Sequence, residues 1–151
     1  MDGSIGLFLC DGCLCYGRVT FFMAEMSDYC ENLVLNHTLG TSDIGSFVTQ
    51  MYLALHTADP TDVTGTGSAN EVDVARQAIS FGTASGTGGS VASTDAQSFT
   101  SMPDVTVTHI GIWNHVSAGD LLFHTAVDSA KTVANGDTIS IAVGAITVTL
   151  A

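Results

Sequence analysis

The nine residues at positions 105–113, VTVTHIGIW, predict a β-strand. They are rich in β-branched and aromatic side chains, which strands favour. His109 alternates with Val105 and Val107, so we expect its side chain either to point inward and hydrogen-bond there or to face a subunit interface. Trp113 is the only tryptophan, and we expect a core or rim aromatic. The alternative is a platform at a strand end on which a sugar could stack.

Short stretches of the same kind on both sides of this segment bring the total to about seven predicted strands. Turn signals separate them. Pro103 ends a strand because proline cannot continue a ladder, Asn135-Gly136 predicts a hairpin, and Gly144 predicts a bend. The Gly- and Ser-rich residues 84–93 predict a mobile connection. Strands at this spacing predict a mainly β fold, an antiparallel β-sandwich or a jelly-roll-like fold. The other predicted strands are residues 47–57, 74–83, 96–102, 120–127, 138–143 and 145–150.

One short helix is predicted ahead of these strands, at residues 28–38. Ser27 or Asp28 can cap its first turn, and Asp28 with Glu31 has the spacing of a capping box. Gly40 supplies a stop signal after the last turn. The sequence therefore predicts one N-terminal helix beside the β structure.

The first 25 residues differ from the rest of the chain. We expect residues 1–25 to be an N-terminal arm, ordered or disordered, or an over-extended start, and residues 26–151 to form a single β-sandwich domain. Cys10, Cys13 and Cys15 lie in the arm. Their C-x-x-C could be half a zinc site or a redox pair, but no second pair follows and no βαβ pattern surrounds it. Free thiols in a peripheral arm are the interpretation that remains.

Composition excludes two classes of partner. The 151 residues carry 3 Lys plus Arg against 15 Asp plus Glu, a formal net charge of −12. Nucleic-acid binding needs several basic residues to neutralise phosphates, and a polybasic membrane dock needs the same. The 19 Thr and 14 Ser supply polar surface without charge. This balance suits a subunit that buries surface in an assembly.

The sequence contains no recognised catalytic or metal-binding motif. The chain has no G-x-S-x-G, no H-E-x-x-H and no P-loop lysine. A zinc or iron site would need ligands such as His109, His124 and an acid, but structural histidines are favoured. We therefore predict no catalytic residue, no cofactor and no metal. Arg76 is expected to pair with a carboxylate such as Glu71 or Asp73, within the protein or across a subunit boundary.

Six motifs occur in serial order along the chain: ENLVLN (31–36), YLALHTADP (52–60), NEV with ARQAISFG (70–72 and 75–82), VTHIGI (107–112), GDLLF (119–123) and SAKTV (129–133). In this order they resemble a family of small tailed-bacteriophage virion structural proteins, often labelled tail fibre. The resemblance covers roughly residues 28–150 and implies a non-enzymatic, β-rich, oligomeric subunit mounted on a virion. It also implies that Arg76 forms an anchoring ion pair and that residues 109–112 lie in a buried central strand.

The function that follows is a structural one. The chain is predicted to be an accessory β subunit on the tail, as fibre or tip, or on the capsid exterior as a decoration protein, with assembly in the host cytoplasm. Its partners would be other virion proteins and further copies of itself, with no nucleic acid and no membrane. The alternative is a module that binds a host receptor or surface glycan through the loops at 61–70 and 84–95 together with Trp113. Arg76, Glu71, His109 and Trp113 are the structural or interface candidates.

Overall fold

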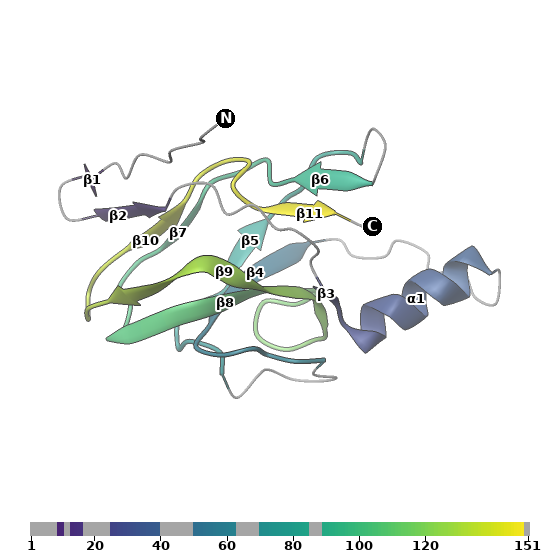
Figure 1. Cartoon of the computed structure of the whole chain (residues 1–151), viewed down its shortest axis with the longest axis horizontal. Coiled ribbons are helices and arrows are strands. Elements are labelled where there is room, and N and C mark those ends of the chain that lie inside the picture. Colours follow the sequence, from purple (N-terminus) through teal and green to yellow (C-terminus); the bar gives the residue numbers. More distant parts are fainter. Residues whose placement is uncertain are drawn as a thin grey trace.

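The computed structural model describes residues 9–10, 13–16, 25–39, 50–62, 70–84 and 89–149 of the chain. Within these residues a β body carries one helix that projects from its side (Figure 1). The strands are β1 (Leu9–Cys10), β2 (Cys13–Tyr16), β3 (Glu25–Met26), β4 (Met51–His56), β5 (Gln77–Ile79), β6 (Ser90–Ala92), β7 (Gln97–Phe99), β8 (Val105–Trp113), β9 (Leu121–Val133), β10 (Ile139–Ile141) and β11 (Thr147–Thr149), and the helix is α1 (Asp28–Thr38).

Three sheets form the body. The largest has the order β3-β9-β8-β4-β5 and is antiparallel throughout. A second has the order β1-β2-β10-β7, in which β2 and β10 run parallel, and β6 pairs with β11 in a short ribbon. The fold is mainly β and sandwich-like with one helix, which confirms the predicted fold class.

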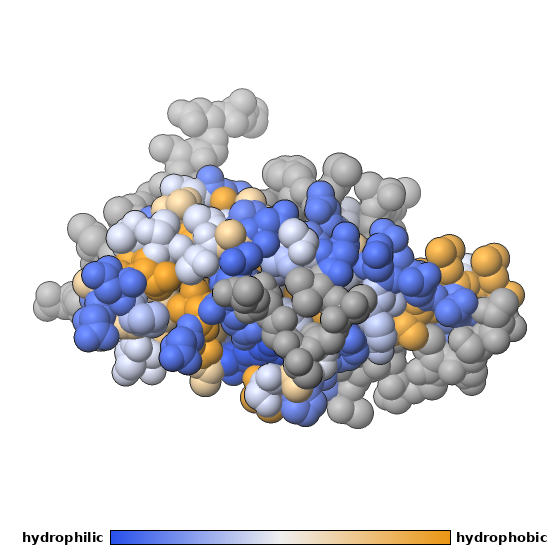
Figure 2. Space-filling model, turned by 90° about the horizontal axis from the view of Figure 1, so that it is seen from below, coloured by the Kyte–Doolittle hydropathy of each residue, from blue (hydrophilic) through white to orange (hydrophobic). Residues whose placement is uncertain are grey.

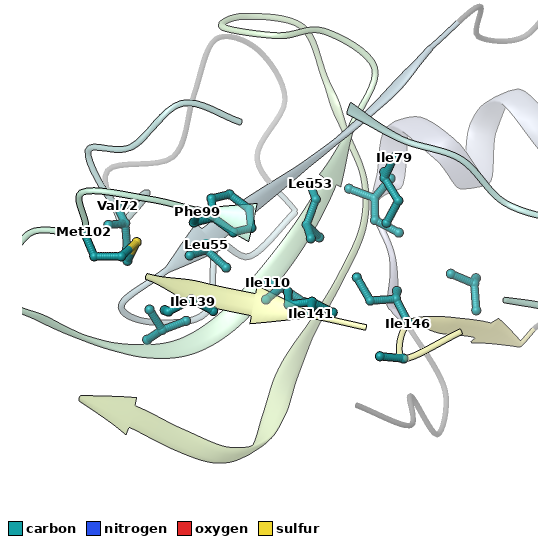
Figure 3. Packing of buried hydrophobic residues seen from close by; sticks show 14 of the residues in the cluster. Leu53, Leu55, Val72, Ile79, Phe99, Met102, Ile110, Ile139, Ile141 and Ile146 are labelled. Atoms are coloured by element: carbon teal, nitrogen blue, oxygen red, sulfur yellow. The ribbon is translucent and has the colours of Figure 1, made fainter. Parts of the chain in front are cut away.

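The core lies between the sheets. Leu53 and Leu55 of β4 and Ile110 of β8 pack in one cluster with Phe99 of β7 and Ile141 of β10 (Figure 3). Side chains alternate across a strand, so the residues between these core positions point to the opposite face of the large sheet. That opposite face, called here the outer face, carries the candidate site.

The helix begins and ends where the sequence predicts. Ser27 is its N-cap: the Ser27 hydroxyl oxygen accepts a hydrogen bond from the backbone N–H of Cys30 at 3.3 Å and the hydroxyl donates to the carbonyl of Leu121. Asp28 lies inside the helix, so the predicted choice between Ser27 and Asp28 falls on Ser27. The predicted stop, Gly40, lies outside the described residues.

Strand β8 has the predicted bounds, but the side chain of His109 does not lie on the predicted face of the strand. Both Val107 and Ile110 are buried in the core cluster, although they are three residues apart. The β8–β9 register shifts between Val107 and His109, because four residues of β9 lie opposite Thr108 alone. The expectation that His109 shares a face with Val107 is therefore wrong, and His109 lies opposite His56 of β4.

The structure also corrects two predictions about the segments between strands, one for a turn and one for a mobile connection. Asn135-Gly136 forms a turn, but Gly136 alone has a positive φ, of 91°. The two-residue hairpin turn favoured by this dipeptide needs both residues there, and the strands on either side, β9 and β10, belong to different sheets. In the stretch predicted as a mobile connection, residues 90–92 form β6, while residues 85–88 lie outside the described part. Gly144, with a φ of 72°, makes the predicted bend.

The strand bounds differ most where the pattern is least periodic. β9 extends six residues beyond the predicted end at residue 127, and β5 covers only three of the ten residues predicted at 74–83. The division between an arm at 1–25 and a domain at 26–151 stays a prediction. The side chains of Cys10, Cys13 and Cys15 lie outside the described part of the chain. Within the described part, Cys30 is a buried free thiol. No helix of the described residues is long and apolar enough to span a membrane.

Candidate functional site

The outer face of the large sheet carries a small cluster of its own. Cross-strand pairing places Tyr52 opposite Trp113, and Ala54 opposite Gly111. Ala54, Trp113 and Leu121 are buried together, with Tyr52 packed against them. Because they lie on three adjacent strands, these residues form a floor on which the neighbouring loops rest.

Arg76 ties two of those loops together. Its Nε donates to Glu71 Oε1 at 2.6 Å and its Nη2 donates to Glu71 Oε2 at 2.8 Å, a bidentate ion pair. Its Nη1 donates to the carbonyl oxygens of His115 at 2.8 Å and Ala118 at 2.9 Å. Charge-assisted bidentate pairs are among the stronger hydrogen bonds in proteins. The segment at 70–76 is thereby fixed to the segment at 114–119.

The guanidinium group also covers Trp113. Arg76 Cζ lies 3.9 Å from the centroid of the Trp113 ring, within the range of a cation–π contact. The His56 ring stacks beside the indole, with centroids 6.2 Å apart and planes inclined by 25°. Trp113 is 0% exposed, so its ring offers no surface to a sugar. The structure thus gives it the position of a core aromatic, the first of the two expectations.

His56 is as fully buried as Trp113 and keeps its neutral form. It is fully buried, and neither ring nitrogen has a hydrogen-bond partner among the described residues. Burial lowers the pKa of His56 from 6.5 to about 4, because a charged ring would lose its hydration; nearby Glu71 opposes the shift and Arg76 adds to it.

Gly111 provides the space that these rings need. A Cβ at this position would lie 2.9 Å from His56 Nε2, 2.9 Å from Leu121 Cδ1 and 3.0 Å from Trp113 Nε1. Contacts that short require atoms to move, since interiors are close-packed. Only glycine therefore fits this position of the central strand.

A second contact holds the loop after β4. His124 of β9 is buried, with its Nδ1 at 3.2 Å from Asp59 Oδ1 and its Nε2 at 3.6 Å from Asp62 Oδ1. Within the loop, Thr61 N–H donates to Asp59 Oδ1 at 2.9 Å, and Asn70 Nδ2 donates to the Asp59 carbonyl at 3.1 Å. Three loop segments, at 57–62, 70–76 and 114–119, are therefore fastened to one face of one sheet. We call them the clamped loops.

An open groove lies between two of the clamped loops. It has a volume of about 380 Å³ and is lined by residues 71–76 with Val116 and Ser117. The polar groups of Arg76 and Glu71 at this groove are engaged with each other and with loop carbonyls. The arrangement serves to hold loops in place.

Three of the four residues singled out from the sequence come together here. Arg76, Glu71 and Trp113 are in direct contact, and Glu71 rather than Asp73 is the arginine's partner. His109 stands apart from that contact: it is half-buried, and its Nδ1 is 2.9 Å from the hydroxyl of its neighbour Thr108. Its expected role at a subunit interface stays a prediction.

Sequence reasoning missed the parts played by His56, Gly111 and His124. They converge through strand register, which no local motif encodes, although residues 54–56 and 109–113 each show the strand pattern that could have suggested pairing. Among the described residues, no group of three or more His, Cys, Asp or Glu side chains could hold a metal ion.

Comparison with known proteins adds one match. Residues 25–149 match the family model described as Podophage GP4 fiber I protein gp80. No curated protein matches the chain.

Proposed function

Because this chain belongs to the family of the podophage GP4 fiber I protein gp80, matched over residues 25–149, we propose that it is an accessory β subunit of a phage tail fibre that acts by packing and not by catalysis. The chain is thus a structural component of a virion. The fibre family favours the tail over the capsid exterior, the other position that the sequence left open.

The contacts of Arg76 are the observation that supports a non-catalytic role. Its hydrogen bonds go to Glu71 and to two loop carbonyls, and its flat face covers Trp113. A guanidinium held in this way fixes the clamped loops and is not presented to a substrate. Rigid loops on a β body are what a subunit needs when it must match the surface of a neighbour.

The proposed partners are other virion proteins and further copies of this chain. A net charge of −12 with only three basic residues disfavours nucleic acid and anionic membranes. Surfaces in which Ser and Thr supply the polar groups can be buried against a partner without stranding charges.

Localisation in purified particles tests this proposal. Quantitative mass spectrometry should find the chain in gradient-purified virions at a fixed ratio to the major capsid protein, and antibody labelling should decorate the tail. Absence from purified particles would reject the proposal. Labelling confined to the capsid would reject the fibre position but not the structural role.

The groove beside Arg76 supports a second candidate, binding of a host receptor or surface glycan. Trp113 is buried, so such a ligand would contact the groove lined by residues 71–76, Val116 and Ser117. Replacing Ser117 with tryptophan would fill the groove while leaving the Arg76–Glu71 pair in place. Glycan-array binding by the wild type that disappears in this variant would favour the candidate, and absence of binding by the wild type would reject it.

A further inference from the structure

His124 of β9 lies between two carboxylates that come from the loop after β4. Its side chain is 4% exposed, with Nδ1 at 3.2 Å from Asp59 Oδ1 and Nε2 at 3.6 Å from Asp62 Oδ1. The side chains of Asp59 and Asp62 are 51% and 52% exposed. A buried imidazole therefore faces two carboxylates that solvent reaches.

The two ring nitrogens of His124 make different contacts. An ionised carboxylate only accepts hydrogen bonds, so the shorter contact, with Asp59, assigns the ring hydrogen of the neutral form to Nδ1. The contact with Asp62 is longer than an N–H···O hydrogen bond, which spans about 2.7–3.2 Å, and Nε2 has no hydrogen-bond partner among the described residues. In the neutral ring, Nε2 thus turns a lone pair toward an oxygen that also has only lone pairs.

A metal cation between these two atoms would satisfy both. Zinc binds a histidine nitrogen at about 2.0–2.1 Å and a carboxylate oxygen at about 2.0–2.2 Å, so two ligands of one tetrahedral zinc ion lie about 3.4 Å apart. The separation of 3.6 Å between His124 Nε2 and Asp62 Oδ1 is close to that spacing. Calcium and magnesium take oxygen ligands, whereas an imidazole suits zinc.

Asp59 has the place of the group that orients a metal-binding histidine. A histidine that binds a metal through one nitrogen usually donates its other N–H to a carboxylate, a carbonyl or water, which fixes the ring. Asp59 is itself held in place: its Oδ1 accepts a hydrogen bond from the backbone N–H of Thr61 at 2.9 Å, and its carbonyl accepts one from Asn70 Nδ2 at 3.1 Å. The ring of His124 is therefore oriented before an ion binds.

The surroundings of this pair are polar and acidic. The loop at 57–62 runs along the lower side of the body in Figure 1, and Figure 2 views that side, where hydrophilic residues cover the middle of the body. Glu25 of β3 is exposed and lies directly opposite His124 in the strand pairing. It adds a third acidic residue beside Asp59 and Asp62, and negative charge of this kind attracts cations from solution.

We propose that His124 Nε2 and Asp62 bind a zinc ion, with Asp59 orienting the ring and with water at the remaining positions. The ion would tie the loop at 57–62 to β9. A site with two ligands from the chain is compatible with the described residues, among which no group of three His, Cys, Asp or Glu side chains suits a metal. The sequence predicted no metal because no motif joins positions 62 and 124, which meet only in the fold.

The test is zinc binding by the full chain at neutral pH, measured by isothermal titration calorimetry, in a background that has serine at positions 10, 13 and 15. The substitutions Cys10→Ser, Cys13→Ser and Cys15→Ser remove thiolate ligands that would bind zinc elsewhere. This background should bind one zinc ion, and Asp62→Asn should weaken the binding at least tenfold. Asp59→Asn removes the charge that orients the ring and should weaken binding by about 10–100-fold.

Two control variants separate this site from other surface ligands. Asp73→Asn removes an exposed carboxylate from the neighbouring segment at 70–76, and His115→Gln removes an exposed imidazole. Both should bind zinc as the background does. Hydrogen exchange of residues 57–62 should slow when zinc is added to the background or to Asp73→Asn, and should not change for Asp62→Asn. Far-ultraviolet circular dichroism checks that every variant is folded.

Three results would overturn the inference. They are no zinc binding by the background protein, equal binding by Asp62→Asn, and binding that is lost in His115→Gln but kept in Asp62→Asn, which would assign the ion to an exposed imidazole. None of these results bears on the position of the chain in the virion, which is measured on purified particles.

Discussion

Replacing Arg76 with alanine should lower the free energy of unfolding by about 3 kcal/mol. The change leaves the Glu71 carboxylate, 19% exposed, without its partner, and breaking a buried pair in this way costs about 3–5 kcal/mol. Residual exposure of Glu71 places the cost at the low end. The carbonyls of His115 and Ala118 lie in a loop where water can replace the arginine. The lost contact with Trp113, worth about 0.5–2 kcal/mol, is counted within this total, because the same substitution breaks both interactions.

The assay is urea unfolding followed by tryptophan fluorescence. Trp113 is the only tryptophan and lies under the guanidinium, so its emission reports this site directly. For a chain of this length the loss corresponds to a drop in melting temperature of roughly 6–12 °C. Arg76→Lys keeps the charge but not the bidentate geometry, so it should recover only part of the loss.

A double-mutant cycle separates the stranded carboxylate from lost packing. In a Glu71→Gln background the carboxylate is already neutral, so Arg76→Ala should cost at least about 1 kcal/mol less than in the wild type. A loss under about 1 kcal/mol for Arg76→Ala, or strict additivity with Glu71→Gln, would refute the account of the clamped loops.

Three further changes probe the outer face and the helix. Gly111→Ala should lower the free energy of unfolding by about 1–3 kcal/mol, since the new Cβ would overlap His56 and Leu121, as a thermal melt would show. His56 has a pKa of about 4 in the folded protein against an ordinary value of 6.5. The unfolded chain therefore binds more protons than the folded one between pH 4 and 6.5. The contribution of His56 to the free energy of unfolding should be level above pH 7 and should fall by up to about 3 kcal/mol as the pH drops from 6.5 to 4. His56→Phe should flatten that part of the curve of unfolding free energy against pH. Ser27→Ala should cost about 1–2 kcal/mol and reduce the helical signal in circular dichroism, because it removes the cap of α1.

Each of these changes has a control and a result that would count against it. Gly82→Ala adds a Cβ with nothing nearer than 3.8 Å, and an equal cost for Gly82→Ala and Gly111→Ala would contradict the packing argument. His37 is exposed on the helix, so a pH curve altered as much by His37→Gln as by His56→Phe would remove His56 as the cause. A Ser27→Ala variant with full helicity and unchanged stability would show that the cap is dispensable.

Features set by neighbours in the sequence were predictable. The helix at 28–38 and the strand at 105–113 have the predicted bounds, because caps and β-branched runs act locally. The sequence predicted that Arg76 pairs with a carboxylate, because an arginine within a strand of so acidic a chain requires a partner of opposite charge. Its choice of Glu71 over Asp73 depends on how the segment at 70–76 lies against β4, where Glu71 forms a bridge with His56.

Features set by strand register were not predictable. The face of His109 accompanies an irregularity in the pairing of β8 with β9 between Val107 and His109, and the meeting of His56, Gly111 and His124 follows from pairing among β4, β8 and β9. The prediction of a hairpin at Asn135-Gly136 was wrong for a related reason. A dipeptide favours a turn locally, but the sheet that receives the next strand is decided by the packing of the whole body.

A reconstruction of the intact virion at a resolution that separates β-strands tests the central claim most directly. The account predicts density in the tail fibres that fits the five-stranded sheet and its clamped loops, with those loops in contact with neighbouring subunits. Fibres with no density for this fold, in particles that infect normally, would contradict it.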